Sequence, residues 1–290
     1  MMIFSKRAQA DLALVLITFI WGSTFSMVKR CLEYISPILF VGLRFWIATV
    51  IVLMCLSGEL HRISARTIGR GLLLSGLLLG GFVFQTIGLR TINPSYSAFI
   101  TSLSILLVPI MGFLLFRQQP GKRTITGVLL ATLGLFFLLL QTEELKISSG
   151  VAFTFACAVM FAFQILFLGR FVSTSNYRQL MIVQLAGTAL MSSFIAPVLE
   201  TPFIIWNSMF VFYLLITGVV ATAFALLMQA WAQRYTDANH AALIFSLEPF
   251  FAALFAFWLL GHGLTAKEWL GGMLILAGIL ISELSIQRPD

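Results

Sequence analysis

The sequence predicts an all-α integral membrane protein with ten transmembrane helices, arranged as an inverted-topology repeat of five plus five. The prediction rests on an apolar composition, ten apolar segments of membrane-spanning length and an internal duplication. Of the 290 residues, 60% are hydrophobic and 10% are charged, whereas a soluble domain usually has about 25% charged residues. A soluble globule with a mean hydropathy of +1.01 would have too few polar residues to cover its surface.

Ten segments approach the length of about 20 largely apolar residues that a helix needs to cross a membrane. The first follows Lys6 and Arg7, as in a signal peptide, but we expect it to stay uncleaved because no small-x-small cleavage site precedes further apolar sequence. Turn residues such as Asn93-Pro94 mark the short connections. The predicted spans are 9–29, 37–57, 69–90, 94–116, 123–141, 148–169, 178–198, 208–233, 238–260 and 265–285.

The distribution of Lys and Arg predicts the orientation. With a cytoplasmic N-terminus, 12 of the 18 basic residues lie on the cytoplasmic side and 5 on the outside, and Arg44 lies within a span. Cytoplasmic loops carry the excess of positive charge, so both termini are predicted to be cytoplasmic. Because the basic residues occur singly or in pairs between apolar runs, the net charge of +7 indicates membrane topology and not a nucleic-acid partner.

An internal repeat appears when the sequence is compared with itself at an offset of 144 residues. There are 11 identities across positions 85–136, and polar and glycine positions match in register. With five spans in each half, the second copy must enter the membrane from the opposite face, and we expect a site near the midplane between the halves. The predicted repeats are 1–142 and 143–290. Matched pairs include Gln85 with Gln229, Ser102 with Ser246, Gly127 with Gly271 and Gly134 with Gly278.

Two charged residues within the spans are candidates for substrate or ion binding. Glu248 lies near the middle of the ninth predicted span, where a charge costs about 2.5–3.5 kcal/mol on insertion scales. It could relay protons or bind a cation, or it could be a protonated carboxyl bonded to a neighbouring helix. Arg44 lies about two turns into the second span and could face an anionic group, pair with Glu248 or extend to the membrane surface.

Prolines and glutamines mark further positions in the spans. Pro109 and Pro249 are predicted to kink the fourth and ninth spans, since each removes a backbone donor and frees a carbonyl one turn earlier. Gln85, Gln164 and Gln229 are costly in lipid and should face the bundle interior, where they bind substrate or join helices.

Aromatic and small residues complete the candidate lining. Trp21-Gly22-Ser23 breaks the apolar first span, and Gly22 allows close approach of a backbone or ligand. Trp21, together with Tyr96 and Trp231, could line a cavity, although such residues also serve as packing or interface anchors. The remaining glycines, namely Gly76, Gly80, Gly81 and the matched pairs, are interpreted as tight helix contacts.

Other chemistries lack their sequence patterns. No H-E-x-x-H motif is present, and the three histidines are scattered at positions 61, 240 and 262, so neither a metal nor a cofactor is predicted. The segment Gly121-Lys122-Arg123-Thr124 lacks the upstream glycine of a P-loop. A self-contained ATP-driven pump is therefore not indicated.

Taken together, these features resemble the EamA-type proteins of the drug/metabolite transporter superfamily. The resemblance rests on ten spans, the duplication, Trp21-Gly22-Ser23 in the first span and Ser246-Leu247-Glu248-Pro249 in the ninth. It implies a basket-like bundle around a central cavity, and a bacterial inner-membrane carrier that commonly exports amino acids or other small metabolites.

The sequence departs from the family pattern at two places. The glycine-glutamate pair that often ends the fourth and ninth helices is replaced by Phe116-Arg117 and Gly261-His262, so no role transfers from that glutamate. The first half also has Ser104 where the second has Glu248, which predicts functionally asymmetric halves.

The resulting hypothesis is a secondary transporter, not an enzyme, that works in the lipid bilayer by alternating access. It would carry small organic metabolites, with protons as a candidate coupling ion at Glu248. The alternatives are a membrane-embedded enzyme acting on lipid-linked substrates and a non-catalytic assembly or sensor subunit. The sequence carries no signal for substrate identity, direction of transport or oligomeric state.

Overall fold

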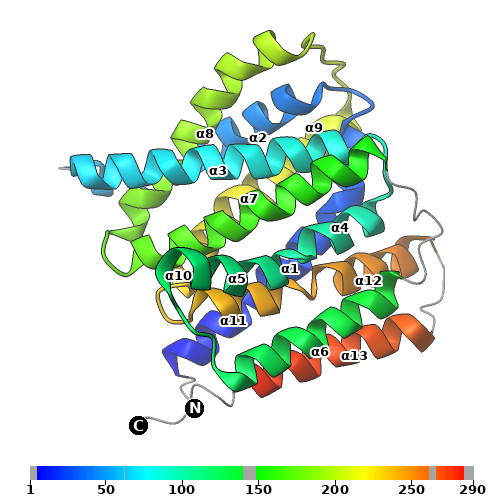
Figure 1. Cartoon of the computed structure of the whole chain (residues 1–290). Helices are drawn as coiled ribbons and strands as arrows, with labels where there is room; N and C mark the ends of the chain where they lie inside the picture. Colours follow the sequence, from blue (N-terminus) through cyan, green and yellow to red (C-terminus); the bar gives the residue numbers. More distant parts are fainter. Residues whose placement is uncertain (1–4, 62, 140–147, 261–265, 284–290) are drawn as a thin grey trace, which may run out of the picture.

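The chain folds into a bundle of helices, as a computed structural model that describes residues 5–61, 63–139, 148–260 and 266–283 shows (Figure 1). Within these ranges β-pairing is limited to an isolated bridge between Ile35 and Ile204. The helices of the first half are α1 (Lys6–Cys31), α2 (Pro37–Leu56), η1 (Ser57–Leu60), α3 (Ala65–Leu89), α4 (Pro94–Ser102), α5 (Ser104–Phe116) and α6 (Lys122–Leu139). Those of the second are α7 (Ser149–Val172), α8 (Tyr177–Leu199), α9 (Ser208–Leu215), η2 (Ile216–Phe224), α10 (Ala225–Ala232), α11 (Ala238–Phe245), α12 (Glu248–Leu260) and α13 (Ala266–Glu283).

The all-helical membrane fold is confirmed. Eight helical segments of the described chain are long and apolar enough to cross a membrane, and Trp269–Ser282 within α13 is a shorter apolar helix. Polar caps define several starts: the side chains of Ser5, Ser64, Asn93 and Asp237 each accept a backbone N–H of the helix that follows. Below, the end of the bundle at which α1 begins is called the Lys6 end, and the end at which it stops is called the Cys31 end.

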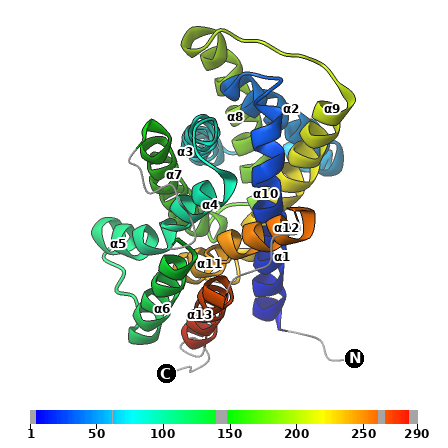
Figure 2. The ribbon, with the colours of Figure 1, turned by 90° about the vertical axis from the view of Figure 1, so that its right-hand side faces the viewer.

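The glycine pairs reveal how the two halves meet. α6 and α13 lie side by side at one edge of the bundle (Figure 2). A Cβ on Gly127 would lie 2.6 Å from the carbonyl oxygen of Gly278, and a Cβ on Gly134 would lie 2.5 Å from that of Gly271. Each contact is the counterpart of the other under the 144-residue offset, which is the pattern that a two-fold relation between repeats produces.

The fourth and ninth spans are each interrupted, but not where the prolines stand. α4 gives way to α5 at Leu103, and α11 gives way to α12 at Ser246 and Leu247, which are repeat-equivalent positions. Pro109 lies inside α5, six residues after the break, and Pro249 lies in the first turn of α12. The expected kink at Pro249 is therefore corrected, because a first-turn proline needs no helical partner for its nitrogen. The kink expected at Pro109, inside α5, stays a prediction. Beside the breaks, Ser102 and Ser246 turn their hydroxyls onto carbonyls of the preceding helix, as bent helices often do.

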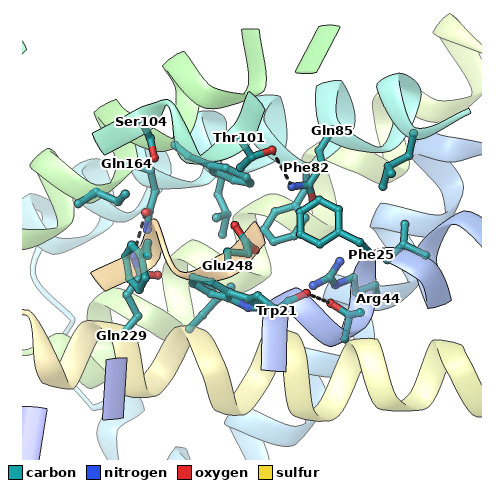
Figure 3. Close-up of a pocket in the computed structure, with 18 residues that line it drawn as sticks. Trp21, Phe25, Arg44, Phe82, Gln85, Thr101, Ser104, Gln164, Gln229 and Glu248 are labelled. Carbon is teal, nitrogen blue, oxygen red and sulfur yellow. Dashed lines mark hydrogen bonds between the residues drawn. The ribbon is translucent and has the colours of Figure 1, made fainter. Parts of the chain in front are cut away.

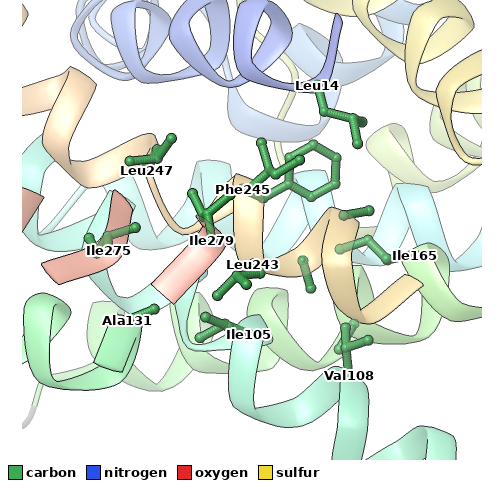
Figure 4. Packing of buried hydrophobic residues seen from close by; sticks show 14 of the residues in the cluster. Leu14, Ile105, Val108, Ala131, Ile165, Leu243, Phe245, Leu247, Ile275 and Ile279 are labelled. Carbon is green, nitrogen blue, oxygen red and sulfur yellow. The ribbon is translucent and has the colours of Figure 1, made fainter. Parts of the chain in front are cut away.

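The two interrupted spans cross at the centre of the bundle. α4 packs against α12, and α5 packs against α11, so that each half-helix meets the opposite half of the other repeat. A buried apolar cluster fills the space beside this crossing, including Leu14, Ile105, Leu243 and Phe245 (Figure 4). Ser104 and Glu248, the first residues of α5 and α12, therefore lie close to this crossing.

The eighth span breaks the symmetry. Residues Ile216–Phe224 form a π-helix between α9 and α10, whereas the repeat-equivalent part of α3 is continuous α-helix. π-helical turns shift the hydrogen-bond register and are frequent at functional sites. The glycine interpretation also needs one correction, because a Cβ on Gly76 would meet nothing within 4 Å.

Gly127→Ala should destabilise the protein, because its Cβ would meet a backbone carbonyl that cannot move independently of its helix. We expect a loss of about 1–3 kcal/mol, as for overpacked cores, measured as a lower midpoint of thermal unfolding in detergent. Gly76→Ala is the matched control and should be neutral or stabilising, since alanine is the better helix former. Equal effects of the two substitutions would contradict a tight α6–α13 contact.

Candidate functional site

A cavity lies between the repeats, with about 670 Å³ of space between its lining residues when the open mouth is counted. Figure 3 shows its lining. The polar and charged lining residues are Thr24, Arg44, Gln85, Thr101, Ser104, Gln164, Gln229 and Glu248. The aromatic ones are Trp21, Phe25, Phe82, Phe161 and Phe245, and the aliphatic ones are Val28, Leu78, Leu89, Ile165 and Leu226.

The first helix of each repeat supplies the same pattern of side chains. Trp21, Thr24 and Phe25 of α1 line the cavity, as do three residues of α7 at the same spacing, 161, 164 and 165. Positions i, i+3 and i+4 lie on one helix face. At these three positions each helix presents two apolar groups and one polar group to the same space, and α1 adds Val28 one turn further along.

Glu248 is placed at the middle of this arrangement. It is the first residue of α12, only 8% exposed, and its side chain lines the cavity. The N-terminus of a helix carries partial positive charge, which favours a carboxylate there. α1 approaches closely at this point: a Cβ on Gly22 would lie 2.8 Å from the Glu248 carbonyl oxygen. Gly22 therefore allows α1 and α12 to touch beside the carboxylate.

Arg44 is held by fixed partners within the bundle. Its Nε donates to Thr222 Oγ1, its Nη2 donates to the Ala221 carbonyl at 3.5 Å, and its guanidinium carbon lies 4.4 Å from the centre of the Phe82 ring. Among the described residues, no ion pair joins it to Glu248. The residue is 2% exposed, so it does not extend to the surface of the bundle.

The π-helix explains why the Ala221 carbonyl is available. The N–H of Ala225, which would bond to Ala221 in an α-helix, bonds to the carbonyls of Thr222 and Val220 instead. The Ala221 oxygen also accepts from Trp21 Nε1 at 2.8 Å. The π-helical register thus joins α1 and α2 to the second repeat at one carbonyl group.

The three predicted glutamines also lie at the cavity. Gln229 Nε2 donates to Gln164 Oε1 at 3.3 Å, and Gln85 Nε2 lies 3.5 Å from Thr101 Oγ1. Both distances are long for hydrogen bonds. The amides therefore keep donor and acceptor capacity for a bound molecule.

Three predicted lining residues lie elsewhere. Ser23 turns its hydroxyl onto the Ile20 carbonyl of its own helix. Tyr96 is buried against Phe99, and Trp231 packs edge-on against Tyr235. Aromatic type alone did not distinguish packing from lining, because all of these rings find apolar neighbours in the bundle.

The sequence interpretation missed several lining residues. Phe82, Thr101, Phe161 and Phe245 carried no signal of their own, although Thr101 and Phe245 are repeat-equivalent. Ser104 was singled out as the counterpart of Glu248, and the structure brings both to one cavity. The Gly261-His262 pair lies outside the described residues. Within the described ranges, no group of three or more His, Cys, Asp or Glu residues could hold a metal ion.

Thr222→Val should destabilise the protein, because it removes the acceptor of the buried Arg44 Nε while keeping the side-chain shape. An unpaired buried donor on a charged group costs about 1–3 kcal/mol or more, measurable as a lower thermal midpoint in detergent. Thr49→Val is the matched control, since that hydroxyl bonds only to the Phe45 carbonyl of its own helix. Similar midpoints for the two variants would argue against Thr222 as an anchor of Arg44.

Comparison with known proteins assigns the two halves to one family. The model of the EamA-like transporter family matches residues 8–140 and again residues 148–284. A crystal structure superposes with a TM-score of 0.76 at 17% identity, covering 97% of this chain and 100% of that chain. This likeness shows the fold.

Two curated relatives span nearly the whole chain. An uncharacterized transporter of Archaeoglobus fulgidus is 35% identical over 286 residues, covering 97% of this chain and 88% of the relative. The uncharacterized transporter YoaV of Bacillus subtilis is 22% identical over 286 residues, covering 96% and 97% respectively.

Proposed function

Because this chain belongs to the EamA-like transporter family, we propose that it is a secondary transporter of small organic metabolites, such as amino acids or related compounds. It works by alternating access through the central cavity and exports its substrate across the bacterial inner membrane. Both termini are cytoplasmic. Protons are the coupling ion, and the carboxyl group of Glu248 carries them.

The position of Glu248 is the observation that carries this proposal. A carboxyl group inside a membrane bundle marks a substrate or proton pathway by default. This one lies at the crossing of two interrupted helices, one from each repeat, and faces a cavity. Sites of secondary transporters lie at such repeat interfaces, on discontinuous helices.

The chemistry of the lining supports a small amphipathic substrate. Rings from Trp21, Phe82 and Phe161 offer apolar faces, and the glutamine amides offer donors and acceptors. Few polar groups among many apolar ones are typical of a ligand site, where they orient the ligand. Thr222 and Ala221 accept two of the five N–H donors of Arg44 and hold its guanidinium in place, so it contributes fixed positive charge at the wall.

Glu248→Gln should abolish transport driven by a pH gradient, because the glutamine amide cannot bind and release a proton as a carboxyl group does. A thermal-shift screen of amino acids, nucleosides and polyamines would first identify a ligand. Its radiolabelled flux is then measured in proteoliposomes with an imposed pH gradient. Glu33→Gln, which changes an exposed carboxylate outside the cavity, is the control and should behave as wild type. Normal gradient-driven flux in Glu248→Gln would remove the coupling role.

The repeat relation allows a second test. Moving the carboxyl group across the cavity, in the double variant Glu248→Ser with Ser104→Glu, places it at the start of the other interrupted helix. If coupling needs a carboxyl at the crossing and not one particular neighbour, gradient-driven flux should return in part relative to Glu248→Ser alone. No recovery in a well-folded double variant would mean that the two positions are not interchangeable.

A further inference from the structure

Buried polar atoms without a hydrogen-bond partner concentrate at the Lys6 end of the bundle. The described residues contain 15 such side-chain atoms, and nine of them belong to Arg7, Asp11, Gln233, Thr236, Asn239 and His240. These six residues, here called the polar cluster, lie at the start of α1, the end of α10, the following turn and the start of α11. Four of these nine atoms meet a charged or polar partner only at 3.5–4.0 Å, and the others have no hydrogen-bond partner among the described residues. Buried polar atoms without hydrogen bonds are expensive inside a membrane protein, so their concentration calls for an explanation.

The polar cluster joins the two repeats. His240 Nε2 lies 3.5 Å from Asp11 Oδ1, and Arg7 Nε lies 4.0 Å from Asp11 Oδ2. The pair formed by Asp11 and His240 thus connects α1 of the first repeat to α11 of the second. α5, α6, α7 and α13 also pack against α11, but within the described ranges none of them brings an ion pair to His240.

Glutamines connect the polar cluster to the cavity. Gln229 and Gln164 form part of the cavity lining and bond to each other. Gln233 follows Gln229 by one helical turn, toward the Lys6 end, and its Nε2 donates to the Ile165 carbonyl at 3.1 Å. Gln164 Nε2 and Gln229 Oε1 are themselves unpaired. The unpaired groups therefore continue from the cavity wall into the polar cluster.

Apolar packing interrupts this route in the present conformation. The cavity-lining residues of α1 begin at Trp21, and Asp11 is ten residues earlier, about 15 Å along the helix. Between them, Leu14 packs in one buried cluster with Leu243 and Phe245 (Figure 4). The cavity is thus closed toward the Lys6 end by contacts between α1 and α11.

We propose that the polar cluster is the second half of the transport pathway, a passage that is closed here and becomes hydrated when α1 separates from α11. The inference rests on the proposed alternating-access function. Groups that face water in one conformation are buried without full partners in the other, which accounts for the unpaired atoms. The contact of Asp11 with His240 holds the passage shut, and opening exposes both residues to the solution at the Lys6 end.

Cysteine labelling tests the passage by a readout that is separate from transport. In a background with Cys31, Cys55 and Cys157 replaced by alanine, Gln233→Cys and Thr236→Cys, both at buried positions of the polar cluster, are placed singly in reconstituted vesicles. The probe is a membrane-impermeant, positively charged methanethiosulfonate reagent. Leu243→Cys, on α11 in the apolar cluster, is the buried control, and Lys6→Cys, which is exposed, reports the side of addition.

Both polar-cluster cysteines should react at least about tenfold faster than Leu243→Cys, because even a minor open population is labelled, and only from the side that labels Lys6→Cys. Rates as slow as that of Leu243→Cys in both variants, or labelling from the opposite side, would overturn the passage. Substrate flux of the cysteine-free parent is measured in the same vesicles. If the parent transports substrate but neither cysteine is labelled, the proposed passage is wrong and the transporter function stands. If the cysteines are labelled but the parent transports nothing, the proposed function is wrong and the hydrated opening stands.

Asp11→Asn, added to Gln233→Cys, tests the closing contact. The amide replaces one carboxylate oxygen of the contact with His240 Nε2 by an NH₂ group, which weakens the contact, so the labelling rate should rise several-fold. Glu33→Gln in the same background is the control and should leave the rate unchanged. An unchanged rate in Asp11→Asn would show that the contact does not hold the passage closed.

Discussion

A guanidinium buried in a membrane bundle needs hydrogen-bond acceptors. The centre of this protein is organised around the acceptors that surround Arg44. The π-helical segment η2 turns the Ala221 carbonyl and the Thr222 hydroxyl toward it, and Phe82 offers its ring face. Trp21 donates to the same carbonyl. Four elements from both repeats are thus tied together at one wall of the cavity, and an opening motion must either carry this group as a unit or break it.

The two-fold relation of the repeats accounts for much of the remaining architecture. Glycines at repeat-equivalent positions bring α6 and α13 into backbone contact, and the two interrupted helices cross where each begins anew. The cavity lies at this crossing, where the first residues of α5 and α12, Ser104 and Glu248, both line it. The described residues also depart from symmetry: Glu248 lines the cavity where the other repeat has Ser104, and the π-helix of the second repeat corresponds to continuous α-helix in α3.

Sequence patterns identified the cavity residues that are polar or charged, but they did not distinguish the aromatic residues that line the cavity from those that pack elsewhere. Glu248, Arg44 and the three glutamines were identified because a polar group within a span needs a reason to be there, and the structure brings all of them to one cavity. Tyr96 and Trp231 were placed there too, but an aromatic ring is equally stable in apolar packing. The prolines indicated the right spans but not the breaks, which lie beside Ser102 and Ser246, whose hydroxyls bond carbonyls of the preceding turn.

The sequence by itself determined the helical membrane fold, the repeat and the candidate charged centre, because apolar length and in-register identities follow from local composition and order. It did not determine which faces meet. The partners of Arg44, the π-helical register of Ile216–Phe224 and the pairing of Asp11 with His240 join residues far apart in the chain. Such contacts depend on how whole helices pack, and only the tertiary structure decides them.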